Sequence, residues 1–120
     1  MKTVKQIRIF VPSKDFELSQ KFYQALGWKM QLVDEGLADM ELEGHHFFLQ
    51  KFYNKDWANN FMIHVVVDDV QAWYEHAKSI IKTGDFAPAR VASPKDEGYA
   101  HVSYVWDPSG VLIHFAQFKN

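Results

Sequence analysis

The stretch "IRIFVPSKDFELSQKFYQALGW", residues 7–28, carries the clearest local signals in the chain. Alternation over residues 4–11 predicts a strand that Pro12 ends, with an apolar face formed by Ile7, Ile9 and Val11. Ser13 is a residue type that caps helices, and Gly27 is the type that ends them. The apolar spacing between these two positions predicts an amphipathic helix that begins after Ser13 and ends at Leu26.

Three extended runs follow this helix, at residues 28–33, 37–43 and 46–52. Short links containing glycine separate them, which favours antiparallel hairpins. The polar, turn-rich segment that follows is typical of a connector. We therefore predict a βαβββ module over residues 1–53 and a connector over residues 54–60.

The same order of elements then begins again. The segment "IHVVV", residues 63–67, aligns with "IRIFV", residues 7–11, and Asp68 or Asp69 precedes an amphipathic helix that starts "DVQAW". Three more extended runs follow at residues 86–93, 99–106 and 111–118. The chain is therefore predicted to be one domain, residues 1–120, with a second module over residues 61–120 and a repeat of roughly 56 residues.

Composition narrows the classes of function. The 120 residues are 48% hydrophobic and 16% aromatic, enough to bury one core and more rings than packing alone usually needs. The net charge is −2 and no Lys/Arg cluster follows a phosphate backbone, so nucleic acid is not an expected partner. The absence of cysteine excludes thiolate metal sites and cysteine nucleophiles. No apolar run approaches the roughly 20 residues that cross a bilayer, so we expect a cytoplasmic protein with no membrane partner.

Both ends of the chain resemble the vicinal oxygen chelate superfamily, which includes glyoxalase, bleomycin resistance proteins, fosfomycin resistance proteins and extradiol dioxygenases. The resembling segments are residues 7–28 and "VWDPSGVLIHFAQ", residues 105–117, where an Asp-Pro-x-Gly turn enters the last strand. The resemblance implies an α+β fold of two βαβββ modules that form an open, cup-shaped half-barrel of eight strands with helices outside. The chain is closest in character to the metal-free, bleomycin resistance-like members of the superfamily. Homodimers are usual among single-domain members of this length.

Alternation along the strands then predicts which side chains face the cup. If Ile7, Ile9 and Val11 pack under the helix, the residues between them face the cup. Three tryptophans lie at strand edges or in the connector, where each can reach the cup or its rim: Trp28, Trp57 and Trp106. Trp73 is more simply a core residue. The predicted ligand-binding residues are Gln6, Arg8, Phe10, Phe48, Gln50, Phe52, Met62, His64, Trp106 and His114.

The resemblance also permits a test for metal binding. The positions where metal-using members carry ligands fall on Gln6, Gln50, Met62 and His114, with His64 one pleat from Met62. Neutral amides and a thioether are poor donors for a borderline divalent cation, so we expect no metal or other cofactor. If an ion binds, Gln6, Gln50, His64 and His114 are the group to suspect. His45 and His46 are adjacent and point opposite ways, which favours a hairpin turn for that pair.

Two functions remain open. The first is a metal-free protein, similar to the antibiotic resistance-like members, that binds a polar or anionic, aromatic small molecule in the cup. An inward Arg8 supports an acidic ligand group, unless Arg8 pairs with a carboxylate such as Glu41, Glu43 or Glu97. The second is an enzyme of the glyoxalase/dioxygenase superfamily, either a metal-dependent lyase or a metal-free isomerase that uses His64 or His114 as a general base. The first function is favoured, so a catalytic role is not expected.

Overall fold

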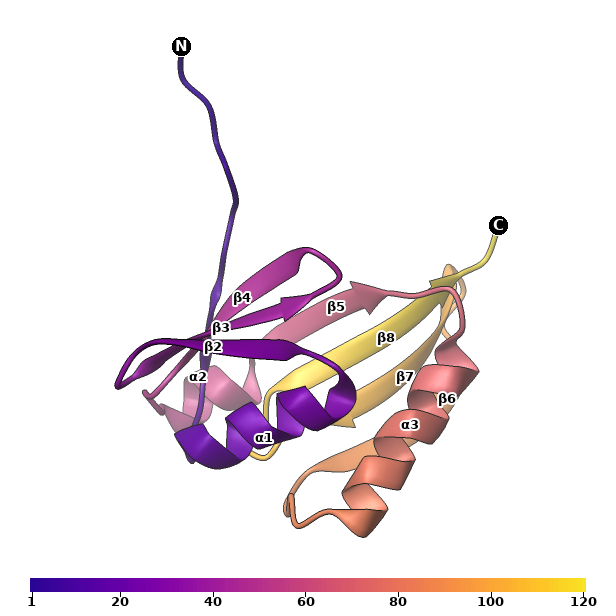
Figure 1. Ribbon diagram of the computed structural model, residues 1–120. Coiled ribbons are helices and arrows are strands. Elements are labelled where there is room, and N and C mark those ends of the chain that lie inside the picture. Colours follow the sequence, from indigo (N-terminus) through magenta and orange to yellow (C-terminus); the bar gives the residue numbers. More distant parts are fainter.

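The computed structural model describes all 120 residues, and its elements follow the predicted order twice (Figure 1). The first module contains β1 (Phe10–Pro12), α1 (Phe16–Leu26), β2 (Lys29–Asp34), β3 (Leu37–Leu42) and β4 (His45–Gln50). A short helix, α2 (Lys55–Asn59), lies in the predicted connector. The second module contains β5 (Met62–Val66), α3 (Val70–Thr83), β6 (Arg90–Asp96), β7 (Ala100–Trp106) and β8 (Leu112–Phe118).

Each module forms its own four-stranded sheet with the same topology. The strand orders are β1-β4-β3-β2 and β5-β8-β7-β6, and the first pair in each order is parallel while the others are antiparallel. The outer edges of β1 and β5 have no strand partner, so the two sheets stay open. The fold class is therefore α+β, as predicted.

One apolar core joins the two modules. Helix α1 contacts β2 and β4, helix α3 contacts β6, β7 and β8, and the two helices touch each other. Side chains from both sheets belong to one buried cluster, among them Val11 and Leu49 of the first and Ile113 and Phe115 of the second. Trp73 stacks on Phe115 with ring centroids 4.7 Å apart, which confirms its predicted place in the core.

A buried polar contact also ties the modules together at the Asp-Pro-Ser-Gly turn. The Tyr23 hydroxyl of α1 donates to Oδ2 of Asp107 at 2.7 Å, and both residues are fully buried. Oδ1 of Asp107 accepts the backbone N–H groups of Ser109 and Val111 at 2.8 and 3.0 Å. Gly110 has a φ of 95°, a left-handed conformation that glycine adopts without strain. The turn thus enters β8 as predicted.

The first strand is much shorter than the predicted residues 4–11. Only residues 10–12 form the strand, and Ile9 accepts one further backbone hydrogen bond from Phe48. Residues 1–9 form an N-terminal arm that leads away from the body (Figure 1). Ile7 is 85% exposed and Ile9 is 45% exposed, so they do not pack under the helix as expected. The parallel register places Phe10 beside Phe48, which sets Ile7 beside the first residue of β4. Residues 1–6 therefore run past the end of their own sheet.

Other boundaries shift for local reasons. Asp15, not Ser13, caps α1 by accepting the Leu18 N–H, because the Ser13 hydroxyl donates to the backbone of Gln50 instead. The strand predicted over residues 86–93 becomes β6, from Arg90 to Asp96, with a register shift between Ala92 and Lys95 at Pro94, which has no N–H to donate.

Two aromatic positions also differ from expectation. Strand β4 ends at Gln50, so Phe52 lies in the following loop rather than on a strand. Its ring is 5.9 Å from that of Trp57, which in turn is 5.8 Å from Phe61. Trp28 is buried in the core against Tyr23 and Phe47 and does not face a cup, because it follows the helix on its packed side.

Candidate binding face

The sheet of the second module presents a continuous row of rings on the side away from α3. Strand register brings His64 beside His114 and His114 beside Tyr104, and Met62 beside Leu112 and Leu112 beside Trp106. Alternate residues of paired strands point to the same face, so these side chains share one surface. We call this surface the ring face and define it by His64, Tyr99, Tyr104, Trp106, His114 and Phe118.

Two histidines lie at the centre of the ring face. Their Nδ1 atoms are 3.2 Å apart, close enough for one to donate to the other, and their rings meet edge to face with centroids 5.4 Å apart. The ring centroids of Tyr104 and His114 are 5.0 Å apart, and Tyr99 stacks beside His64 with ring centroids 6.1 Å apart. Burial and the neighbouring His64 lower the pKa of His114, so its imidazole is neutral at neutral pH.

The other end of the ring face carries a cation. The guanidinium of Arg90 lies 3.6 Å from the centroid of the Trp106 ring, and Trp106 stacks beside Tyr104 at 6.3 Å. The Tyr104 hydroxyl donates to the carboxylate of Glu97. The predicted strand over residues 86–93 contained Arg90, but the pairing of Arg90 with Trp106 depends on the register shift between Ala92 and Lys95, which the sequence pattern did not predict.

The ring face is open to solvent and apolar at its margins. Met62 is 62% exposed, Val66 60%, Tyr99 53% and Phe118 48%. Large apolar side chains gathered on one exposed surface are typical of a binding site. Beneath them, Ala100, Val102 and Ala116 form a small, fully buried cluster that supports the rings.

The sheet of the first module carries a second, different group of predicted residues. Phe10 and Phe48 are in contact at 5.3 Å, and Arg8 lies over the Phe48 ring at 5.1 Å. Arg8 also pairs with Asp39 at 3.3 Å, and His46 contacts the same carboxylate at 3.0 Å. The carboxylate partner of Arg8 is therefore Asp39 rather than Glu41, Glu43 or Glu97. His46 is the second residue of β4 rather than part of a turn.

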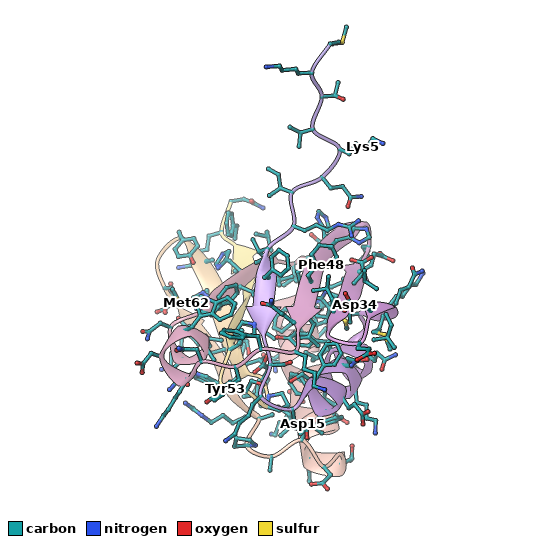
Figure 2. The ribbon with its side chains drawn as sticks, turned by 90° about the vertical axis from the view of Figure 1, so that its left-hand side faces the viewer. Lys5, Asp15, Asp34, Phe48, Tyr53 and Met62 are labelled. Atoms are coloured by element: carbon teal, nitrogen blue, oxygen red, sulfur yellow. The ribbon has the colours of Figure 1, made fainter.

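The predicted residues thus divide between two faces. Gln6, Arg8, Phe10, Phe48 and Gln50 belong to the first module, whereas Met62, His64, Trp106 and His114 belong to the second. No hydrogen bond, ion pair or ring contact joins the two groups. In Figure 2, Phe48 and Met62 lie on opposite sides of β1.

A groove separates the modules at the unpaired edge of β5. It has a volume of about 790 Å³ and contains Ile9, which is the last residue of the arm. Its apolar walls include Trp28, Leu42, Phe47, Ile63, Val65 and Trp73. Its polar lining consists of three acidic residues and three histidines, which are Glu43, Asp68, Asp69, His45, His46 and His64.

The predicted metal donors do not come together in one site. Gln6 lies in the arm, and its side-chain oxygen accepts hydrogen bonds from Arg8. Gln50 lies on the other sheet from His64 and His114. No group of three or more His, Cys, Asp or Glu side chains is arranged to hold a metal ion.

Solved structures with the same fold are numerous. A bleomycin-binding protein complexed with bleomycin matches with a TM-score of 0.79 and 22% identity, covering 97% of this chain and 100% of that one. A bleomycin resistance determinant encoded on the transposon Tn5 matches with a TM-score of 0.79 and 23% identity, covering 98% of this chain and 100% of that one. A lactoylglutathione lyase from Agrobacterium tumefaciens matches with a TM-score of 0.69 and 13% identity, covering 98% of this chain and 100% of that one.

Comparison at the level of sequence gives no match. No family model and no curated protein matches the chain. The likeness to solved structures confirms the predicted fold, which this chain shares with bleomycin-binding proteins and a lactoylglutathione lyase. None of the helices has the length and apolar character to span a membrane.

Proposed function

From a fold shared with bleomycin-binding proteins, we propose that this protein binds a small organic molecule without a resident metal, and that the ring face is the binding surface. The proposed ligand is aromatic and carries a polar or anionic group. The observation that carries this proposal is the continuity of the rings from Trp106 through Tyr104 and His114 to His64.

Ring chemistry explains the preference for such a ligand. Exposed aromatic faces stack on flat molecules, and each stacked or edge-to-face pair adds about 0.5–1.5 kcal/mol beyond area burial. The histidine pair adds hydrogen-bonding nitrogens in the middle of this surface. The face therefore combines apolar contact with a few polar groups that fix orientation, as ligand sites usually do.

A thermal-shift screen of aromatic and anionic metabolites and antibiotics tests the proposal. A ligand at 100 times its Kd stabilises the protein by about 2.7 kcal/mol, which raises the melting temperature measurably. A compound that binds as proposed loses affinity in His114→Ala and Trp106→Ala while both variants keep the wild-type circular dichroism spectrum. His101→Ala, at an exposed position elsewhere on β7, is the matched control. Equal binding by all three variants contradicts the assigned surface.

The absence of a resident metal is proposed on the chemistry of the donors. Two imidazoles with no carboxylate or further imidazole beside them give a divalent cation little compensation for lost hydration. Inductively coupled plasma analysis of protein purified without chelator is expected to find no stoichiometric metal. One equivalent of zinc, nickel, manganese or iron would refute this part of the proposal.

We also propose that the protein is a homodimer in which the N-terminal arm of one copy binds the other. Val4 and Ile7 of the arm are 78% and 85% exposed, and no strand of their own chain lies beside residues 1–6. The unpaired edge of β5 borders an apolar groove whose lining includes Glu43, Asp68 and Asp69, and the arm carries Lys2 and Lys5. The arm thus matches this groove in both apolar character and charge.

Light scattering coupled to size-exclusion chromatography tests the dimer. The full 120-residue chain is expected to elute at twice its 14.0 kDa mass, and Ile7→Asp at the monomer mass. Thr3→Asp introduces the same charge at an arm residue that is not apolar and serves as the control. A monomeric wild type, or a dimer unaffected by Ile7→Asp, contradicts the arrangement. A cytoplasmic location stays a prediction of the sequence.

A metal-free isomerase is the second candidate, and the lowered pKa of His114 is the observation in its favour. A neutral imidazole beside bound substrate is able to accept a proton. If this reading is right, a screening hit is converted rather than merely bound, and His114→Gln abolishes conversion. Recovery of the unchanged compound after long incubation, checked by mass and chiral analysis, supports binding alone.

A further inference from the structure

We infer that Arg90 selects ligands that carry an anionic group at the end of the ring face formed by Trp106. The inference rests on the proposed function and names the charge of its ligand and the residue that reads it. The sequence predicted Arg8 as the cation that meets an acidic ligand group. Arg8 already has a carboxylate partner, Asp39, on the other sheet, so that role is assigned to Arg90 instead.

The Arg90 side chain is held but not neutralised. Its guanidinium lies 3.6 Å from the centre of the Trp106 ring, well within the distance at which a cation is attracted to an aromatic face. It makes no hydrogen bond and no ion pair. The acidic residues in this sheet and its turns have other partners: Asp96 pairs with Lys119, Glu97 accepts from Tyr104, and Asp107 accepts from Tyr23.

A guanidinium in this position keeps its N–H groups free. The indole occupies one face of the planar cation, whereas the donors point outward in its plane. These donors match the paired oxygens of a carboxylate, phosphate or sulfonate. Because Arg90 and Trp106 are register partners, an acidic group bound there brings the attached ring onto Trp106 and Tyr104.

Two fluorescent probes separate the charge from the ring. 1-Anilinonaphthalene-8-sulfonate and N-phenyl-1-naphthylamine share an aromatic skeleton, and only the first carries a sulfonate. Kd values are measured by fluorescence titration for wild type, Arg90→Met and Arg90→Lys. Lys78→Met is the matched control, since Lys78 lies over the Tyr74 ring at 5.7 Å on α3, away from the ring face.

Arg90→Met is expected to weaken the sulfonate probe about tenfold, the usual scale of one charge-assisted contact, and to change the uncharged probe less than twofold. Arg90→Lys keeps the charge but not the planar guanidinium, so its Kd for the sulfonate probe is expected to lie between those of wild type and Arg90→Met. Lys78→Met is expected to change neither.

Three results would overturn the assignment. Equal weakening of both probes by Arg90→Met means that Arg90 only supports the Trp106 ring. Unchanged binding of both probes means that the cation takes no part, while the proposed binding face stands. If wild type binds neither probe, the proposed face itself fails, and Trp106→Ala then has no effect on the fluorescence of either.

Discussion

Replacing Tyr23 with Phe removes one hydroxyl from the buried contact between the modules and leaves the ring in place. The Tyr23 hydroxyl is the side-chain donor to Oδ2 of Asp107, at 2.7 Å. Because the ring also contacts Trp28 and Phe47 in the core, the packing of the variant is preserved. The change therefore isolates a single hydrogen bond to a buried carboxyl group.

The size of the effect depends on the charge of Asp107. Burial raises the pKa of Asp107 to about 6, against the hydrogen bonds from Tyr23 and the backbone, which lower it. At pH 8 the acceptor is ionised, and losing a bond to a charged group costs about 1.5–3 kcal/mol. At pH 5 the carboxyl is protonated and a neutral bond is worth about 0.5–1.5 kcal/mol. Tyr23→Phe should thus destabilise more at pH 8 than at pH 5.

The same pKa gives the sign for wild type. The folded value of about 6 lies above the ordinary aspartate value of about 3.9, so the folded state binds the proton more tightly than the unfolded state. The contribution to stability is complete below about pH 4 and is lost as pH rises through 6. Its full size is about 3 kcal/mol, from about 1.4 kcal/mol for each unit of pKa.

Urea unfolding followed by circular dichroism at pH 5 and pH 8 measures both effects. Tyr74→Phe is the control, because Tyr74 lies on α3 and its hydroxyl makes no hydrogen bond, so its replacement should cost little at either pH. The reasoning is refuted if Tyr23→Phe costs the same at both pH values. A wild type whose stability rises between pH 5 and pH 8 would need a larger, opposite contribution from other groups.

Three further changes test the fold. Phe115→Ala, at a fully buried ring stacked on Trp73, should cost about 3–5 kcal/mol of unfolding free energy in urea; a loss below 1 kcal/mol would contradict the shared core. Gly110→Ala places a Cβ at a φ of 95° and 2.7 Å from the Asn59 side chain, so a cost of about 1–2 kcal/mol is expected by thermal unfolding. Asp39→Asn breaks a partly exposed ion pair and should cost less than about 1 kcal/mol; a larger loss would show that the arm base is essential to folding.

The order of helices and strands was predicted well because the residues that begin or end each element act locally. Asp69, Gly27 and the Asp-Pro-Ser-Gly turn have side chains or conformations that act within a few residues. The same local logic overextended the first strand, because residues 4–11 alternate as a strand should. Whether they pair depends on where β4 begins, some forty residues further along the chain, and that cannot be read from the alternation itself.

The candidate site was predicted in part. Repeat alignment found His64 and His114, since strands at matching positions in the two modules carry matching faces. The partner of Arg8 was missed because Asp39 belongs to a strand whose register with β4 is set by the hairpin link. Arg90 was missed because Pro94 shifts the register of β6, an effect that composition does not reveal.

The most direct test of the central claim is a site-resolved titration. Backbone amide signals and indole N–H signals of the 15N-labelled chain are followed by NMR as 1-anilinonaphthalene-8-sulfonate is added. If the ring face is the binding surface, the shifts concentrate at His64, Tyr104, Trp106 and His114, and include the Trp106 indole N–H. Shifts confined to the first module around Phe48, or to the N-terminal end of α1, would contradict the account.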